Sequence, residues 1–138
     1  MKGSPVTADV PFEEVLARDA GVLERLGLRY DWHREGVCRM SATVLPEMVN
    51  AAGFAHGAMF FALADTAAAY AVRSLKVYGV TTDANMHYAK GAEAGEEIYV
   101  EATVINRSRR LASIRAEVRR LEDDRLLTHG TFTFMLLG

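Results

Sequence analysis

The feature that most constrains this chain is an apolar segment, residues 58–72, that carries a single carboxylate. Apart from the phenol of Tyr70, Asp65 and Thr66 provide the only polar side chains of the segment. A helix that is apolar on nearly every side is normally surrounded by protein. An ionised carboxylate in such surroundings costs several kcal/mol unless something compensates it. We therefore expect Asp65 to be either paired or functional.

Segments in which apolar residues alternate with polar ones flank this helix and predict strands. Before the helix, residues 28–33 and 37–44 alternate, and the turn between them predicts a hairpin. After the helix, the strand candidates are residues 81–88, 97–106, 111–121 and 126–136. The short connections between the last three predict antiparallel neighbours. The fold expected is α+β: one long antiparallel sheet wrapped around one central helix from about residue 57 to residue 76.

The first 27 residues form an N-terminal extension ahead of the first predicted strand. Apolar residues recur at helical spacing between residues 11 and 26, which predicts either one helix or two short helices broken near Gly21. The remaining residues, 28–138, are expected to form one domain.

Composition excludes several classes of function. Half of the 138 residues are apolar and the net charge is −2, which gives no general attraction to nucleic acid or to anionic membranes. No N-terminal hydrophobic run is present and the central helix is short for a bilayer span, so we expect a cytoplasmic protein. The single cysteine, Cys38, excludes an intramolecular disulfide and is expected to be a buried core residue. His33, His87 and His129 lack metal-ligand spacing, so no metal is expected. No other cofactor is expected either.

The sequence around the central helix resembles a known family. Asn50, His56-Gly57 and Leu63-Ala64-Asp65 resemble, in identity and spacing, the hotdog-fold acyl-CoA thioesterases of the phenylacetate-degradation (PaaI) and THEM2-like type. The resemblance covers about residues 37–137. It implies a hotdog fold, hydrolysis of an acyl- or aryl-acyl-CoA to the free acid and CoA, and a homotetramer. The family usually has a second glycine where this chain has Ala58.

Two groups on the predicted helix suit thioester hydrolysis, which requires oxyanion stabilisation and an activated nucleophile. The first turn of a helix offers unpaired N–H groups, so the Gly57 N–H is the candidate oxyanion donor. The alternative is that Gly57 only permits a tight start of the helix. Asp65 is the candidate general base or nucleophile, with a pKa raised by desolvation. The alternative for Asp65 is a carboxylate that faces solvent or caps a neighbouring element.

The spacing of these two groups predicts a dimeric site. Gly57 and Asp65 are eight residues apart, which is about 12 Å along a helix and about 80° around it. One substrate carbonyl has to lie at about 3 Å from both groups. We therefore predict that Gly57 of one subunit and Asp65 of another form the site, so that a dimer is the smallest active unit. Open strand edges favour such pairing.

Three polar side chains near the helix are further candidates. The Asn50 amide can hold the thioester carbonyl, or only its own loop. His56 can orient the start of the helix or contact the substrate. Thr81, or Thr82 after a one-residue slip, can position the attacking water near Asp65, and the alternative is an ordinary strand residue.

Basic residues suggest where the coenzyme A phosphates bind. Arg109 and Arg110 lie in a basic turn, and Lys90 is a weaker candidate. The alternative is a solvated turn. Delivery of the substrate by acyl carrier protein is less favoured, because the sequence shows no broad basic surface that would bind such a carrier. Several Met and aromatic residues are candidates for lining an acyl pocket, although such residues more often form core.

Two other functions stay open at this level. Some hotdog domains bind acyl-CoA without hydrolysing it, but they usually lack the acid that Asp65 provides here. An enoyl-thioester hydratase on the same fold would need a His and an acid near the reacting carbons, and His56 with Asp65 could be recruited for that. An Asp65→Asn variant separates these possibilities, because it should abolish hydrolysis and retain acyl-CoA binding.

Overall fold

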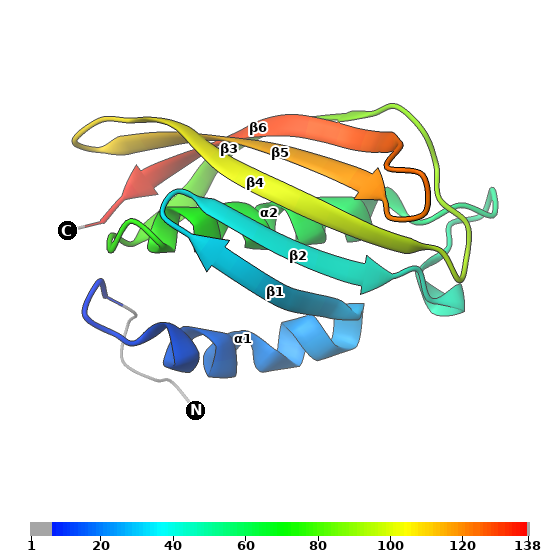
Figure 1. Cartoon of the computed structure of the whole chain (residues 1–138), viewed down its shortest axis with the longest axis horizontal. Helices are drawn as coiled ribbons and strands as arrows, with labels where there is room; N and C mark the ends of the chain where they lie inside the picture. The colour runs from blue at the N-terminus through cyan, green and yellow to red at the C-terminus, as the bar shows by residue number, and fades with distance from the viewer. Residues whose placement is uncertain (1–6, 138) are drawn as a thin grey trace.

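The computed structural model describes residues 7–137, so residues 1–6 of the predicted N-terminal extension and Gly138 lie outside the described part. The helices are α1 (Phe12–Leu26), the short 3-10 helix η1 (Pro46–Met48) and α2 (Gly57–Arg73). The strands are β1 (Leu28–Arg34), β2 (Val37–Thr43), β3 (Gly79–Tyr88), β4 (Glu97–Arg107), β5 (Leu111–Arg120) and β6 (Leu126–Leu136). Figure 1 shows one curved sheet with α2 along one face and α1 beside β1.

The six strands form one antiparallel sheet in the order β1-β2-β4-β5-β6-β3. The predicted hairpin and the antiparallel pairing of the last three strands are confirmed. The sheet contacts α2 through all six of its strands, so the predicted α+β arrangement of one long sheet around one central helix is confirmed. This is the hotdog fold.

The core lies between α2 and the concave face of the sheet. Along β4 and β5, buried residues alternate with more exposed ones, as the period-two pattern predicted. On α2 the buried residues include Leu63, Ala64, Ala67 and Ala68, and the small alanines let the sheet approach the helix backbone. Cys38 is fully buried in this core, as expected, and burial raises the pKa of its thiol to about 12.

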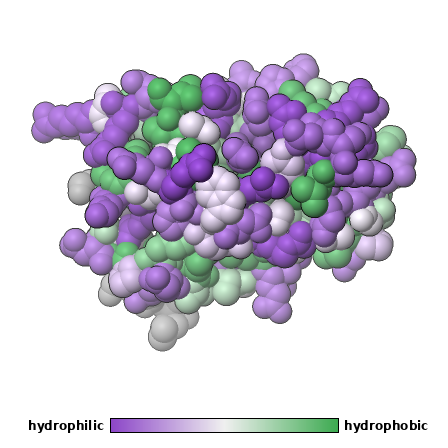
Figure 2. Space-filling view, in the orientation of Figure 1, coloured by the Kyte–Doolittle hydropathy of each residue, from purple (hydrophilic) through white to green (hydrophobic). Residues whose placement is uncertain are grey.

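The opposite face of the sheet carries polar side chains. Arg39 lies over the ring of Tyr99 at 3.9 Å and pairs with Glu101 across the strands. Figure 2 shows the corresponding face of the molecule as mostly hydrophilic, with scattered apolar patches. Because the outer face of the sheet is polar and the concave face is apolar, α2 packs against the concave face.

The N-terminal helix differs from one sequence expectation. The break near Gly21 is wrong, because α1 is one continuous helix that ends at Gly27, whose φ of 68° provides a left-handed cap. A glycine within a helix costs only about 1 kcal/mol relative to alanine, so it need not interrupt one. The predicted end of α2 at residue 76 is also late: the helix stops at Arg73, and Lys76 has a left-handed φ of 62°.

Two neighbouring surfaces of the described chain are left without a partner element. Strand β3 is an edge of the sheet, and most of its residues are exposed. Beside it, the uncovered side of α2 presents Ala58, Phe61, Asp65 and Ala69. An unpaired strand edge next to a helix stripe of small residues is the kind of surface that a second copy can cover.

Candidate active site

The carboxylate of Asp65 is bound by a strand residue of the same chain. Asp65 lies in the middle of α2 on its half-buried side, and the Thr81 hydroxyl on β3 donates a hydrogen bond of 2.7 Å to Oδ1 of Asp65. The structure thus brings together two of the predicted site residues. Oδ2 has no hydrogen-bond partner among residues 7–137, so one oxygen of the carboxylate can act on a ligand.

The surroundings of Asp65 favour its protonated form. Burial raises the pKa of the Asp65 carboxyl above its ordinary value, and the hydrogen bond from Thr81 opposes part of this rise by stabilising the ionised form. A raised pKa brings a carboxylate closer to the pH at which an enzyme works, which improves it as a base. The predicted direction of the shift is confirmed.

A bulge in β3 decides which threonine faces Asp65. The register with β6 shifts between Thr81 and Asp83, and the residue between them, Thr82, donates instead to the backbone oxygen of Thr133. Thr81 therefore takes the position beside the carboxylate, and the alternative alignment on Thr82 is wrong. An extra residue of this kind re-aims the side chains around it.

The start of α2 presents a free backbone donor. His56 caps the helix, because its Nδ1 accepts a hydrogen bond of 3.0 Å from the Ala58 N–H. For the Gly57 N–H, the described residues supply no acceptor. The ring of Tyr88 lies against Gly57 and its hydroxyl donates to the Gly57 carbonyl oxygen at 3.4 Å. Gly57 therefore combines an open N–H with the positive end of the helix dipole.

Asn50 organises the loop that leads into α2. Its Oδ1 accepts from the Ala52 N–H at 2.9 Å and from the Phe54 N–H at 3.1 Å, and its own backbone N–H donates to the Phe54 oxygen. The carbonyl of the side chain is thus committed to the loop, and its NH₂ group is the part that can still donate to a ligand.

The two central groups do not meet within one chain. Gly57 and Asp65 both lie on the unbroken helix α2, where eight residues correspond to about 12 Å along the axis. The distance between the open N–H and the carboxylate therefore exceeds what one carbonyl can bridge.

The three predicted phosphate-binding residues fall into two places. Arg109 and Arg110 line a hollow of about 940 Å³ between the β4–β5 turn and the end of β6. Lys90 lines a separate hollow of about 430 Å³ together with Phe54 and Arg125. This second hollow lies at the end of the sheet where α2 begins, because Lys90 follows β3 two residues after Tyr88. The structure does not bring Lys90 together with the two arginines.

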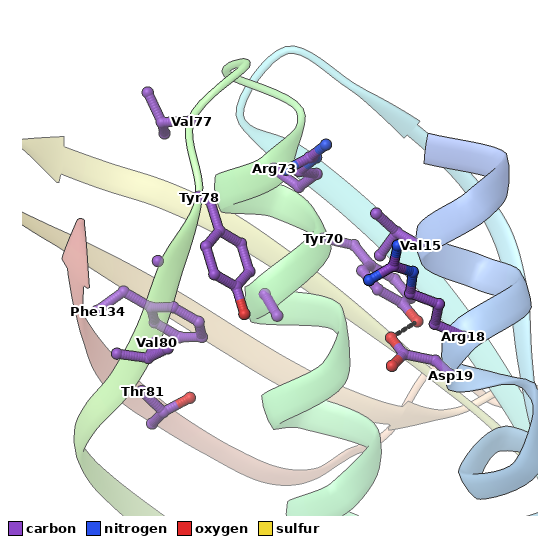
Figure 3. Close-up of a pocket in the computed structure, with 12 residues that line it drawn as sticks. Val15, Arg18, Asp19, Tyr70, Arg73, Val77, Tyr78, Val80, Thr81 and Phe134 are labelled. Carbon is purple, nitrogen blue, oxygen red and sulfur yellow. Dashed lines mark hydrogen bonds between the residues drawn. The ribbon is translucent and has the colours of Figure 1, made fainter. Parts of the chain in front are cut away.

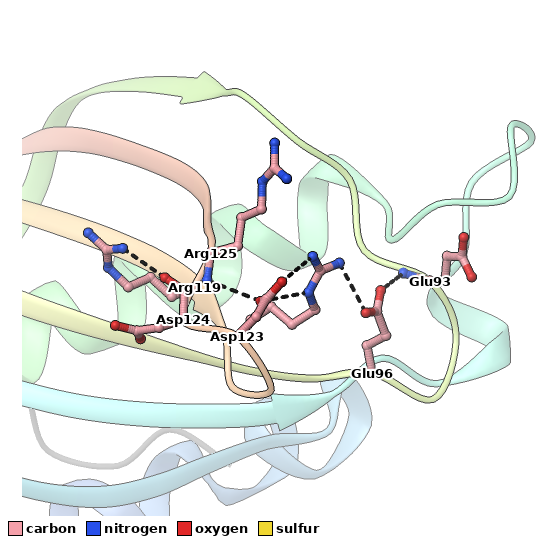
Figure 4. Close-up of polar contacts among 7 residues, drawn as sticks. Glu93, Glu96, Arg119, Asp123, Asp124 and Arg125 are labelled. Carbon is pink, nitrogen blue, oxygen red and sulfur yellow. Dashed lines mark hydrogen bonds and ion pairs between the residues drawn. The ribbon is translucent and has the colours of Figure 1, made fainter.

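Ion pairs border the Lys90 hollow. Arg120 binds Glu96 at 3.1 Å and Asp123 at 2.8 Å, and its guanidinium holds the pKa of Asp123 down to about 2. Figure 4 shows that Arg125 extends away from this network. Arg125 is a phosphate candidate that sequence reasoning missed, since its position beside Lys90 depends on the pairing of β3 with β6.

The Met and aromatic residues that are candidates for lining an acyl pocket differ in burial. Met59, Phe60 and Tyr70 are buried in the core, whereas Phe54 and Phe61 are partly exposed. The rings of His87 and His129 lie against each other across β3 and β6, with their centroids 5.2 Å apart. Among residues 7–137, no three His, Cys, Asp or Glu side chains are grouped so as to hold a metal ion. In the same range, no helix has the length and apolar character needed to cross a membrane.

Comparisons with known proteins identify the family of the chain. The sequence profile of the thioesterase superfamily matches residues 52–127, more than half of the chain. A protein of Deinococcus radiodurans described as a putative esterase is 32% identical over 120 residues, covering 87% of this chain and 79% of its own length. The chain belongs to the thioesterase superfamily, and its activity is that of a thioester hydrolase.

Solved structures show the same fold. A mutant of the phenylacetic acid degradation protein PaaI from Thermus thermophilus is 30% identical, covers 85% of this chain and 99% of its own, and superposes with a TM-score of 0.80. A protein from Streptococcus mutans, bound to acetyl-CoA, is 21% identical, covers 80% of this chain and 89% of its own, and has a TM-score of 0.77. The PaaI-like resemblance of the sequence is confirmed.

Proposed function

We propose that this protein hydrolyses an acyl- or aryl-acyl-CoA thioester to the free acid and CoA. The observation that carries the proposal is the Asp65–Thr81 pair, a carboxylate with a raised pKa that keeps one oxygen open on the uncovered side of α2. The likeness to a protein solved with acetyl-CoA supports the choice of coenzyme A thioesters. No metal or other cofactor takes part in the proposed reaction, in which coenzyme A belongs to the substrate.

The proposed reaction uses Gly57 and Asp65 in different roles. The Gly57 N–H polarises the thioester carbonyl and stabilises the oxyanion. Asp65 takes a proton from water while the water oxygen bonds to the carbonyl carbon, and collapse of the oxyanion breaks the C–S bond as Asp65 returns the proton to the thiolate. In the second route, Asp65 itself attacks, releases CoA and forms an anhydride that water then hydrolyses. Single turnover in ¹⁸O-labelled water can identify the second route, because label enters Asp65 only when water attacks the Asp65 carbonyl carbon of the anhydride.

The proposed active unit is a homodimer that pairs into a tetramer. The separation of Gly57 from Asp65 on one helix requires the oxyanion donor to come from a second copy. The uncovered stripe of α2 and the free edge of β3 supply a surface for this contact. Asn50 and His56 hold the start of the helix that each subunit contributes to the other.

Two basic places compete for the coenzyme A phosphates. Arg109 and Arg110 offer guanidinium groups in the larger hollow, and Lys90 with Arg125 offers two cations next to Phe54 at the end where α2 begins. Comparing KM for acyl-CoA between Arg109→Ala/Arg110→Ala and Lys90→Ala/Arg125→Ala variants assigns the phosphates, since substitution of the pair that binds them raises KM and leaves kcat unchanged.

The proposed location is the cytoplasm. A coenzyme A substrate and a lone buried cysteine both suit this reducing compartment.

Release of free CoA from a panel of alkyl- and aryl-acyl-CoAs tests the proposal. Wild type should hydrolyse some member, and Asp65→Asn should lose hydrolysis while it retains acyl-CoA binding. Thiol detection needs a Cys38 blank, although burial makes this thiol slow to react. Binding without turnover by wild type would instead indicate a sensing module.

A further inference from the structure

A groove leads away from Asp65 along the uncovered side of α2. A hollow of about 220 Å³ contains Asp65 and Thr66 at one end and Asp19 and Tyr70 at the other. A second hollow of about 260 Å³ shares Asp19 and Tyr70 with the first and extends to Thr81. The two hollows share Asp19, Ala69 and Tyr70 as lining residues, and they begin at the two members of the Asp65–Thr81 pair. Together they are named the groove, and Figure 3 draws the residues that line the second hollow.

The walls of the groove come from two elements far apart in the sequence. Helix α1 forms one wall, β3 forms the other, and Ala69 of α2 lies between them as the floor. Ala69 is one helical turn beyond Asp65, and its methyl group fills little of the space between the two walls. The wall supplied by α1 is therefore what gives the groove its depth.

Helix α1 is fixed against α2 by polar contacts. The Tyr70 hydroxyl donates a hydrogen bond of 2.6 Å to Oδ2 of Asp19. The guanidinium of Arg73, which is only 8% exposed, donates to the backbone oxygens of Thr7 and Val10 just before α1. These donors come from the last two turns of α2, so hydrogen bonds join the wall of the groove to the helix that forms its floor.

The groove presents a specific acceptor. Because Tyr70 donates to Oδ2, the Asp19 carboxylate is held at the α1 wall and keeps acceptor capacity on its other oxygen. Burial and the neighbouring Asp19 both raise the pKa of the Tyr70 phenol, so this residue keeps its proton and its role as the donor. A ligand group that reaches this point must donate a hydrogen bond to gain from it.

We propose that α1 forms one wall of the acyl-binding groove and that Asp19, oriented by Tyr70, selects acyl groups whose far end carries a hydrogen-bond donor such as a hydroxyl. This inference rests on the proposed thioesterase activity. A cavity of about 150 Å³ holds one benzene molecule, so a groove whose larger hollow measures about 260 Å³ suits a short acyl chain or a single ring.

A matched pair of substrates tests the selection. Heptanoyl-CoA and 6-hydroxyhexanoyl-CoA have the same length and differ by a terminal methyl against a hydroxyl. A hydrogen bond to a charged acceptor predicts that wild type prefers the hydroxylated substrate by about tenfold in kcat/KM. Asp19→Asn keeps an oxygen for Tyr70 and should reduce this preference. The double variant Asp19→Leu/Tyr70→Phe removes both polar partners together, which protects the fold, and should reverse the preference.

Two controls separate selection from a structural effect. Acetyl-CoA is the short control substrate, and any loss of its hydrolysis in a variant measures the structural effect of that substitution, so selection is read from the ratio of kcat/KM for the two longer substrates. Glu24→Gln removes a charge from the exposed side of α1 and should leave the preference as in wild type. Equal loss on all three substrates, or a wild type without preference, would overturn the proposal.

Failure of the thioesterase assignment gives a different result. If wild type hydrolyses no acyl-CoA, ligand-observed NMR measures how tightly 6-hydroxyhexanoate and heptanoate each bind to the groove. Tighter binding of the hydroxy acid that is lost in the double variant would support the groove assignment without catalysis. Equal binding of the two acids would overturn it.

Discussion

The Thr81 hydroxyl donates a 2.7 Å hydrogen bond to Asp65, which joins the edge strand β3 to the middle of the central helix. The two residues are 16 positions apart, and a bulge after Thr81 turns the next threonine away. The contact links the ionisation of Asp65 to the position of β3. The same strand is the free edge of the sheet, so the proposed pairing of a second copy along this edge would connect dimer formation with the properties of the carboxylate.

Loss of this hydrogen bond should shift the pH dependence of hydrolysis. A general base must be ionised, so activity falls as the pH drops through the raised pKa of Asp65. The Thr81 hydroxyl lowers that pKa, and Thr81→Val should therefore move the acidic limb of the kcat/KM profile to higher pH. The matched control is Thr82→Val, whose hydroxyl binds Thr133 instead and whose removal should leave the limb in place. An unmoved limb in Thr81→Val would exclude the coupling.

Proline at position 57 should remove the oxyanion donor and keep the helix. Gly57 is the first residue of α2, where proline is well tolerated, and His56 already has the extended conformation, with ψ of 138°, that proline requires before it. We expect kcat to fall by about 10²–10³ in Gly57→Pro. Gly57→Ala keeps the N–H, and its added carbon would meet the Tyr88 ring at an ordinary 3.5 Å.

Circular dichroism and kcat compare these two variants. Both should retain the wild-type spectrum, and only the proline variant should show the full loss in kcat. A proline variant that is folded and fully active would remove Gly57 from the proposed mechanism. A smaller effect of Gly57→Ala, confined to KM, would indicate that the methyl group crowds the substrate.

Local patterns in the sequence were sufficient for much of the fold. Period-two alternation located β4 and β5 within one residue at each end, because each strand buries one face against α2. The order of the strands had no comparable signal. Strand β3 pairs with β6 across nearly 50 residues, and such a pairing is determined by closure of the whole sheet rather than by neighbouring residues.

The candidate site was predictable where it depends on one helix and was hidden where it depends on the pairing of strands. The sequence places Gly57 at the start of α2 and Asp65 in its middle, as the structure does. The choice between Thr81 and Thr82 depends on a bulge, which a sequence pattern does not reveal. The contact of Asp19 with Tyr70 was also missed, although a lone phenol in an apolar helix signals that its hydroxyl needs a partner.

Neutralising Asp65 should stabilise the protein at neutral pH. The folded-state pKa of Asp65 is raised by burial, so folding favours the protonated carboxyl and its ionisation costs stability above that pKa. Asp65→Asn, which can still accept from Thr81, should therefore raise Tm at pH 7–8. The gain should shrink as the pH falls and vanish below the unfolded-state pKa of about 3.9. Thermal unfolding of both proteins from pH 3.5 to pH 8 measures this, and a gain that grows toward acid would contradict the assigned shift.

Two inactive variants should restore activity when they share a dimer. In a mixed dimer of Asp65→Asn and Gly57→Pro chains, one site has both defects, and the other combines the intact Asp65 of one chain with the intact Gly57 of its partner. Random pairing places half of the chains in mixed dimers with one of two sites intact, so co-refolded protein should recover about a quarter of wild-type activity. Each variant refolded alone provides the baseline. If both groups served the same chain's site, every site in the mixture would lack one of them, and activity would stay at that baseline.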